Sequence, residues 1–141
     1  MSSEETLRII DQRTEALNAR DWDRFLGLHA DSVVYTPGLG PSLRGRADLL
    51  GFFQALVKAS PDFRLRKEHA FGDSGWVRAE YTGSGTLEGN LEGPGGMTIP
   101  ATNKPFRLRD CTVFRVEGGK IAEVRVYFDP LGIMAQLGLG P

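Results

Sequence analysis

Asp110 is the residue of this sequence best placed for acid/base chemistry. Within residues 106–116, "FRLRDCTVFRV", it alternates with Leu108, Thr112 and Phe114, so these side chains share one face of a predicted strand. A carboxyl group among apolar side chains has a raised pKa and can act as a general base or acid near neutral pH. The alternative is an outward carboxylate paired with a neighbouring arginine, because a single bulge reverses strand parity.

His69 is a second residue whose type suits proton transfer. In "DFRLRKEHAF", residues 62–71, it alternates with Phe63, Leu65 and Phe71, so the pattern predicts an inward, buried histidine. Imidazole titrates near pH 6.5 and can exchange protons with a ligand. The alternative is a hydrogen-bonded histidine in the core or at its rim, with no chemical role.

Glu80 and Arg78 form a third pair of ionisable groups. They lie two residues apart in "WVRAEY", residues 76–81, and therefore share one face of a predicted strand. An ion pair between them is the simplest expectation, on either side of the sheet. The large aromatic side chains are expected in the core or in a pocket wall, namely Trp76, Phe52, Phe53 and Phe128.

Asp129 stands between an alternating segment and a short apolar helical one. Aspartate at the N-cap with proline at the next position is a favoured helix start, and such a cap contributes about 1 kcal/mol. Strand alternation also separates Asp129 from the apolar face of Val124, Val126 and Phe128. A helix cap is therefore favoured over a catalytic acid/base.

The sequence lacks the signatures of metal and nucleotide enzymes. Two histidines, His29 and His69, and one distant cysteine give no zinc spacing. The glycines at 89–96 lack the lysine and helix of a phosphate-binding loop, and no nucleophile motif is present. We therefore expect no metal and no cofactor.

Composition is that of one soluble domain over residues 1–141, with 40% hydrophobic residues. Seventeen basic and eighteen acidic residues give a net charge of -1, which gives no reason to expect a nucleic acid or a membrane as partner. A single cysteine suits a reducing compartment, and the first residues resemble no targeting segment. A cytoplasmic location is expected.

Hydrophobic periodicity predicts helices first and strands later. A period near 3.6 predicts helices within residues 2–21, 21–30 and 46–60, and a short strand within 31–38. From residue 62 the period changes to two, which predicts strands at 62–71, 76–87, 106–116 and 121–129, the last two as a hairpin. Residues 88–105 are predicted to form a glycine- and proline-rich loop, and a short helix is predicted from Pro130.

These elements predict an α+β domain. We expect a cone-shaped, curved antiparallel sheet that wraps around the N-terminal helices and encloses an apolar pocket. The loop at 88–105 is expected near the mouth of this pocket or at an oligomer interface.

A family resemblance lies in "DWDRFLGLHADSVVYTPG", "GSGTLEGNLEG" and the segment from "IPATNKPFRLRD" to "YFDPLGIMAQLG". The resemblance is to the SnoaL-like proteins of the nuclear-transport-factor-2-like superfamily. It implies a deep apolar pocket, no cofactor, a homodimer and one or two proton-handling groups. Known chemistries on this fold include polyketide cyclisation by an aldol reaction, ketosteroid isomerisation and limonene-type epoxide hydrolysis, so the fold alone does not decide the function.

Three positions depart from the enzymes of this family. Leu87, Phe114 and Val126 align with positions where those enzymes carry ionisable groups. Limonene-type epoxide hydrolases resemble this chain in the spacing of Arg78 and Glu80, but their second carboxylate aligns with Val126. The apolar set favours a pocket without chemistry. Tyr35 aligns with residues of the pocket floor, where it either donates a hydrogen bond to a ligand carbonyl or only buries its ring.

The leading hypothesis is a cofactor-free proton-transfer enzyme that cyclises or isomerises a carbonyl compound. Asp110 would be the acid/base, His69 a second proton carrier and Tyr35 a donor to the substrate oxygen. The predicted contacts of an apolar substrate in the pocket are Glu80, Thr112, Phe114, Val126, Phe128 and Trp76. The alternative is a non-catalytic module for ligand binding or dimerisation, and a limonene-type epoxide hydrolase is less favoured.

Overall fold

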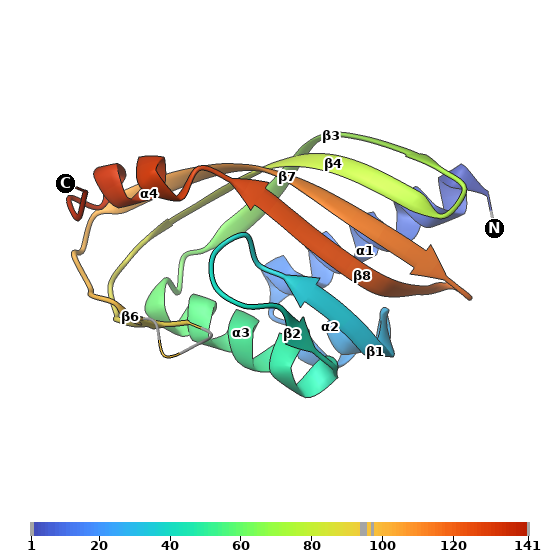
Figure 1. Ribbon diagram of the computed structural model, residues 1–141, viewed down its shortest axis with the longest axis horizontal. Coiled ribbons are helices and arrows are strands. Elements are labelled where there is room, and N and C mark those ends of the chain that lie inside the picture. Colours follow the sequence, from blue (N-terminus) through green and yellow to red (C-terminus); the bar gives the residue numbers. More distant parts are fainter. Residues whose placement is uncertain (1, 94–95, 97, 141) are drawn as a thin grey trace.

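The computed structural model describes residues 2–93, 96 and 98–140, and its elements follow the predicted order (Figure 1). The helices are α1 (Ser3–Ala19), α2 (Trp22–Gly27), α3 (Arg46–Ala59) and α4 (Pro130–Gln136). The strands are β1 (His29–Thr36), β2 (Leu43–Arg44), β3 (Arg64–Asp73), β4 (Trp76–Thr86), β5 (Leu91–Glu92), β6 (Thr98–Ile99), β7 (Pro105–Glu117) and β8 (Lys120–Phe128).

Side-chain caps start the first two helices. The Ser2 hydroxyl accepts a hydrogen bond from the Glu5 amide at 3.1 Å, and the Asp21 carboxylate accepts one from the Arg24 amide at 3.2 Å. Each cap satisfies one of the amides that a helix start leaves without a partner. At its other end α1 closes with Arg20 in the left-handed region, at φ 58°.

The main sheet has the strand order β2-β1-β8-β7-β4-β3. Its hairpins β3–β4 and β7–β8 and the β4–β7 pair are antiparallel. The exception is β1, which runs parallel to β8, so the sheet is mixed and not antiparallel throughout. This pairing joins a strand near the start of the chain to one near its end, and no local sequence pattern predicts such a contact.

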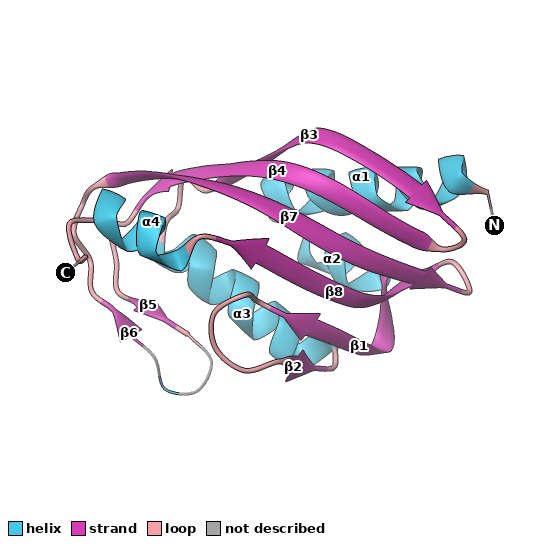
Figure 2. Ribbon diagram, turned by 45° about the horizontal axis from the view of Figure 1, so that its top comes forward, coloured by secondary structure: helices cyan, strands magenta, loops and turns pink. Residues whose placement is uncertain are grey.

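The sheet is curved, and the helices α1, α2 and α3 lie against its concave side (Figures 1 and 2). The short α4 lies at one end of the sheet, far from the N-terminus (Figure 1). The α+β class and the cone-like arrangement are therefore confirmed. No helix in the described part of the chain is long and apolar enough to span a membrane.

Two apolar clusters hold the domain together. The larger one joins α1, α2 and α3 to the concave side of β1, β4, β7 and β8, and includes Leu17, Phe25 and Phe53. The smaller one is formed by Ala59, Leu87, Ile99 and Leu137 at the end where α4 lies. Phe106 packs against both clusters. The space between them is the site described below.

The segment at 88–105 contains a small two-stranded ladder. Leu91 pairs with Ile99 and Glu92 with Thr98, and the Asn90 side chain accepts a hydrogen bond from the Ala101 amide at 2.9 Å. The expected loop is thus partly ordered as β5 and β6. Residues 94, 95 and 97 of this expected loop lie outside the described residues.

Asp129 caps α4, as the sequence predicts. Its carboxylate is exposed and accepts a hydrogen bond from the Gly132 amide at 3.0 Å. We expect Asp129→Ala to lower the free energy of unfolding by about 1 kcal/mol, because that amide loses its partner. Asp129→Asn keeps an acceptor and should stay within a few tenths of the wild-type value. Urea denaturation measures both variants, and equal stability of Asp129→Ala and wild type would contradict the cap.

Candidate functional site

A cavity of about 170 Å³ lies between the concave side of the sheet and the helices. Its wall is apolar for the most part, with Leu56, Phe63, Phe106 and Leu108 among its residues. Leu91, Ile99, Ile133 and Leu137 close it from the β5–β6 arm and from α4. The arm that the sequence places near a pocket mouth therefore lines the cavity.

Four polar side chains face this space among the described residues that line it, namely Arg13, Tyr35, Asp110 and Thr112. They offer a cation, a phenol, a carboxyl group and a hydroxyl. Such a set can hold an oxygen atom of a ligand and move a proton. Within the described ranges, no three His, Cys, Asp or Glu residues are placed to share a metal ion.

Strand register explains why Asp110 points inward. It pairs with Tyr81 on one side and with Phe128 on the other. Directly paired residues project to the same face of a sheet, and Tyr81 is buried under the helices. The inward orientation of Asp110 and Thr112 is therefore confirmed, and the outward alternative is wrong.

The apolar wall gives Asp110 unusual acid/base properties. Burial raises the pKa of this carboxyl from 3.8 to about 6, while the Thr112 hydroxyl and the charge of Arg13 oppose the shift. Thr112 donates its hydroxyl hydrogen to Asp110 Oδ1 at 2.7 Å. A carboxyl with this pKa exchanges protons close to neutral pH, as general acid/base catalysis requires.

Tyr35 lies on β1, with its ring packed against Phe52 and Phe53 at centroid distances of 5.1 and 5.3 Å. It lines the cavity, as the sequence predicts. Burial raises its pKa well above the usual range, although the charge of Arg13 opposes this. The phenol therefore stays neutral and can donate a hydrogen bond to a ligand oxygen.

Arg13 is the functional candidate that the sequence analysis missed. It lies on α1, is only 3% exposed and lines the cavity. Its position follows Ile10 by three residues and precedes Leu17 by four, so helical periodicity places it on the buried face. That spacing was the available signal, but a search for apolar residues on this face passes over an arginine.

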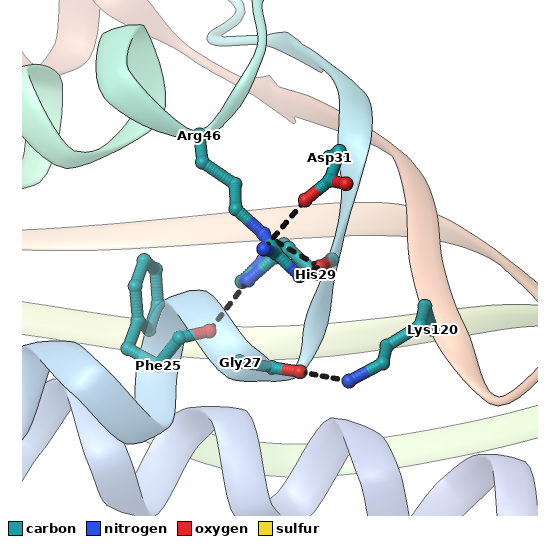
Figure 3. Close-up of polar contacts among 6 residues, drawn as sticks. All are labelled: Phe25, Gly27, His29, Asp31, Arg46 and Lys120. Carbon is teal, nitrogen blue, oxygen red and sulfur yellow. Dashed lines mark hydrogen bonds and ion pairs between the residues drawn. The ribbon is translucent and has the colours of Figure 1, made fainter.

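His29 holds Arg13 in place. Its Nδ1 donates to the Phe25 carbonyl at 2.7 Å (Figure 3), and its Nε2 accepts from Arg13 Nε at 3.1 Å. Arginine has no acceptor, so Nε2 carries no hydrogen and the ring is the neutral Nδ1–H tautomer. Burial, together with the charges of Arg13 and Arg46, lowers the pKa of His29 to about 3.

The backbone around His29 is also anchored. Arg46, at the start of α3, donates through Nε to the His29 carbonyl at 3.0 Å and pairs with Asp31 at 2.6 Å (Figure 3). At the other side, Lys120 donates to the Gly27 carbonyl (Figure 3). The junction of α2 and β1 is thus fixed from α3 and from β8.

His69 does not reach the cavity, so the predicted inward orientation is wrong. A register shift in β3 falls between Lys67 and His69, and His69 pairs with Glu80 on the outer side. This bulge leaves Leu65 facing inward and moves His69 and Phe71 to the exposed face. His69 is therefore corrected from a second proton carrier to a surface residue.

Glu80 and Trp76 are likewise outside the cavity. The buried residues of β4 are Val77, Ala79, Tyr81 and Gly83, so the alternate positions, including Arg78, face outward. Glu80 is exposed, and Trp76 is half-buried with the Arg125 guanidinium 5.3 Å from its ring. Both predicted ligand contacts are wrong, and the Arg78–Glu80 arrangement of an epoxide hydrolase is absent from the cavity.

The remaining predicted wall residues divide between cavity and core. Val126 and Phe128 line the cavity. Phe114 is fully buried in the larger cluster and lies behind the cavity wall, with the Arg13 guanidinium 5.1 Å from its ring. Its role as a ligand contact is corrected to one of supporting Arg13.

The sequence model of the SnoaL-like polyketide cyclase family matches residues 8–137. The chain belongs to this family. The match includes every residue of the polar set in the cavity. No curated protein is significantly similar to the chain.

Several solved structures share the fold over nearly their full length. A candidate SnoaL-like polyketide cyclase from Jannaschia sp. CCS1 superposes with a TM-score of 0.85 at 16% identity, over 99% of this chain and 95% of that one. AclR, a candidate hydroxylase from Streptomyces galilaeus, gives 0.80 at 18% identity, over 99% and 100%. A candidate polyketide cyclase from Xanthomonas campestris gives 0.78 at 24% identity, over 96% and 98%. At such identities the likeness concerns the fold.

Proposed function

We propose that this protein binds an apolar carbonyl compound and catalyses a cofactor-free proton transfer, with Asp110 as the general acid/base. The observation that carries the proposal is a carboxyl group of pKa about 6 that faces a largely apolar cavity. Membership of the SnoaL-like polyketide cyclase family supports an isomerase- or cyclase-type pocket. Isomerisation and intramolecular aldol cyclisation both begin with the same proton transfer.

In the proposed reaction, the Asp110 carboxylate removes a proton from the carbon next to the substrate carbonyl. The electron pair of that C–H bond moves to the carbonyl oxygen and forms an enolate, to which Tyr35 donates a hydrogen bond. In an isomerisation the proton returns from Asp110 to a different carbon. In a cyclisation the enolate carbon bonds to a second carbonyl carbon, and the resulting alkoxide takes the proton from Asp110.

The position of Asp110 suits this task energetically. A carboxylate of pKa about 6 is a stronger base than one of pKa 3.8, yet it is largely deprotonated at neutral pH. Proton transfer by a positioned side chain contributes roughly 10²- to 10⁴-fold in rate. The apolar wall strengthens the hydrogen bond from Tyr35 to the developing charge because little solvent screens it.

We expect the protein to accelerate exchange of the α-protons of cyclic and aromatic ketones for deuterium. NMR in D₂O against a buffer blank measures this directly. Because the base must be deprotonated, the rate should rise as pH increases through about 6 and level off above it. A rate that falls above pH 6 would instead make Asp110 a general acid. Absence of acceleration across a ketone panel at every pH would contradict catalysis.

The second candidate is a ligand-binding module without chemistry. Leu87 and Val126 line the cavity where the sequence resemblance expects ionisable groups, so the cavity is more apolar than the resemblance implies. Saturable binding of ketones, with no proton exchange at any pH, would support this candidate.

A further inference from the structure

Arg13 is a buried cation without a counter-ion in direct contact. None of the ion pairs among the described residues includes it. Its Nε donates a hydrogen bond to the neutral His29. The ring centroids of Phe25, Phe53 and Phe114 lie 5.3, 5.5 and 5.1 Å from the guanidinium carbon. The protein therefore surrounds the guanidinium with one imidazole and three aromatic rings.

This arrangement is costly unless another group completes it. Removing an ion from water is costly, and cation–π contacts offset only part of that cost. Burial lowers the pKa of Arg13, although Tyr81, Tyr35 and Asp110 oppose the shift. Arginine nevertheless remains charged in proteins. The cost points to an anion that the chain itself does not provide.

The unused donors of Arg13 face the cavity. Within the described residues, the terminal nitrogens Nη1 and Nη2 make no hydrogen bond. Neither nitrogen is fully enclosed by protein atoms. They must therefore border open space. Since Arg13 is 3% exposed and lines the cavity, that space is the cavity.

Asp110 does not supply the missing partner. It faces the same cavity, but it forms no ion pair with Arg13, and Thr112 occupies its Oδ1. Its charge acts on Arg13 only at longer range. The cavity thus has a cationic end at α1 and a separate carboxyl group on β7.

We propose that Arg13 binds the carboxylate of an apolar organic acid whose hydrocarbon part fills the cavity. The planar guanidinium presents two parallel donors that match the two oxygens of a carboxylate. The aromatic wall formed by Phe52, Phe63, Phe106 and Phe128 suits a flat ring system. As a statement about substrate class this rests on the proposed function, but the anion site itself does not require Asp110 to be catalytic.

Matched acids and alcohols test the site. The probes are benzoate, 2-naphthoate and anthracene-2-carboxylate, each compared with its neutral hydroxymethyl analogue by titration calorimetry. We expect at least one acid to bind the wild type more tightly than its alcohol, and Arg13→Met to raise the Kd of that acid at least about tenfold. The Kd of the alcohol should change less than about threefold.

Two controls make the result specific. Arg13→Met keeps much of the side-chain volume and removes a charge that has no ion-pair partner. It leaves His29 Nε2 without its donor, so the variant should fold with some loss of stability. Thermal unfolding of the variant checks this. Arg8→Met removes an arginine from the exposed face of the same helix and should leave both affinities unchanged. Equal weakening of acid and alcohol in Arg13→Met would overturn the proposal, as would the absence of any acid preference in the wild type.

The Asp110→Asn variant separates this inference from the proposed function. It should still bind the acid with an Arg13-dependent preference, because it keeps the cation and loses a negative charge from the cavity. Acid binding in the wild type without any Asp110-dependent proton exchange would leave the anion site intact and contradict the proposed catalysis. Proton exchange on neutral ketones, with no preference of the wild type for acids over alcohols, would support the proposed catalysis and contradict the anion site.

Discussion

Asp110→Asn should lower the rate of α-proton exchange at least about a hundredfold. The amide cannot accept the proton. Its oxygen can still accept the hydrogen bond from Thr112, which measures 2.7 Å in the wild type. A hundredfold loss corresponds to about 2.7 kcal/mol of transition-state stabilisation. Initial rates at saturating substrate, measured at pH 8 where Asp110 is deprotonated in the wild type, provide the test.

The same substitution should make the protein more stable at high pH. The native state holds the Asp110 proton with a pKa of about 6 and the unfolded state with one of 3.8, so the native state binds more protons between these values. Stability therefore falls as pH rises through this window, by about 1.4 kcal/mol per pH unit. Above pH 6 the charged carboxylate costs about 3 kcal/mol, and Asp110→Asn removes this cost. Urea denaturation at pH 8 and at pH 3.5 should show the gain only at pH 8.

Glu80→Gln is the matched control for both measurements. It makes the same chemical change on the outer side of the neighbouring strand β4, at an exposed position. We expect near-normal exchange rates and little change in the pH dependence of stability. Near-normal turnover in Asp110→Asn would end the assignment of Asp110 as acid/base. Lost turnover without the gain in stability at pH 8 would mean that the carboxylate is better solvated than the cavity implies.

Alternation and periodicity in the sequence predicted the helices, the strands and the inward face of β7, because these patterns reflect burial directly. Asp110, Thr112, Val126 and Phe128 were found in this way and lie in the cavity. Arg13 was missed for a related reason. A buried charge interrupts the apolar pattern that marks a helix face, and only its position between Ile10 and Leu17 indicates burial.

The wrong assignments arise from features that alternation cannot reveal. One extra residue at the bulge of β3 reverses every later side chain, which turns His69 and Phe71 outward. In β4 the alternation was evident, but which face would be concave depended on packing against distant helices. Trp76 and Glu80 were assigned to the wrong side for that reason. The parallel pairing of β1 with β8 likewise depends on the tertiary arrangement.

His29 should make the protein sensitive to mild acid. Its pKa is about 3 in the native state and 6.5 in the unfolded state, so the unfolded state binds the proton first as pH falls. The stabilising contribution of the neutral ring is complete above pH 6.5 and is lost progressively below it, by about 1.4 kcal/mol per pH unit. Between pH 6.5 and pH 5 this amounts to about 2 kcal/mol.

Asp110 opposes this effect in the same pH range, because its protonation between pH 6 and pH 5 stabilises the native state. The prediction is therefore tested in the Asp110→Asn background. There, the free energy of unfolding should fall by about 2 kcal/mol between pH 7 and pH 5. Hydrogen bonds from Thr86 lower the pKa of Asp62 from its ordinary value of 3.8, so this carboxylate contributes mainly at lower pH.

Adding His29→Gln to this background should remove most of the pH dependence, whatever its effect on absolute stability. Replacing the exposed His69 by Gln is the matched control, and the dependence should persist there because His29 remains. Ring-nitrogen NMR provides a second test that needs no variant: His29 should remain the neutral Nδ1–H tautomer at pH 5, held by the Phe25 carbonyl and by Arg13. A His29 ring that takes up a proton near pH 6 would mean that Nε2 does not accept from Arg13. The guanidinium would then lack the support that orients it toward the cavity, and the carboxylate site would lose its structural basis.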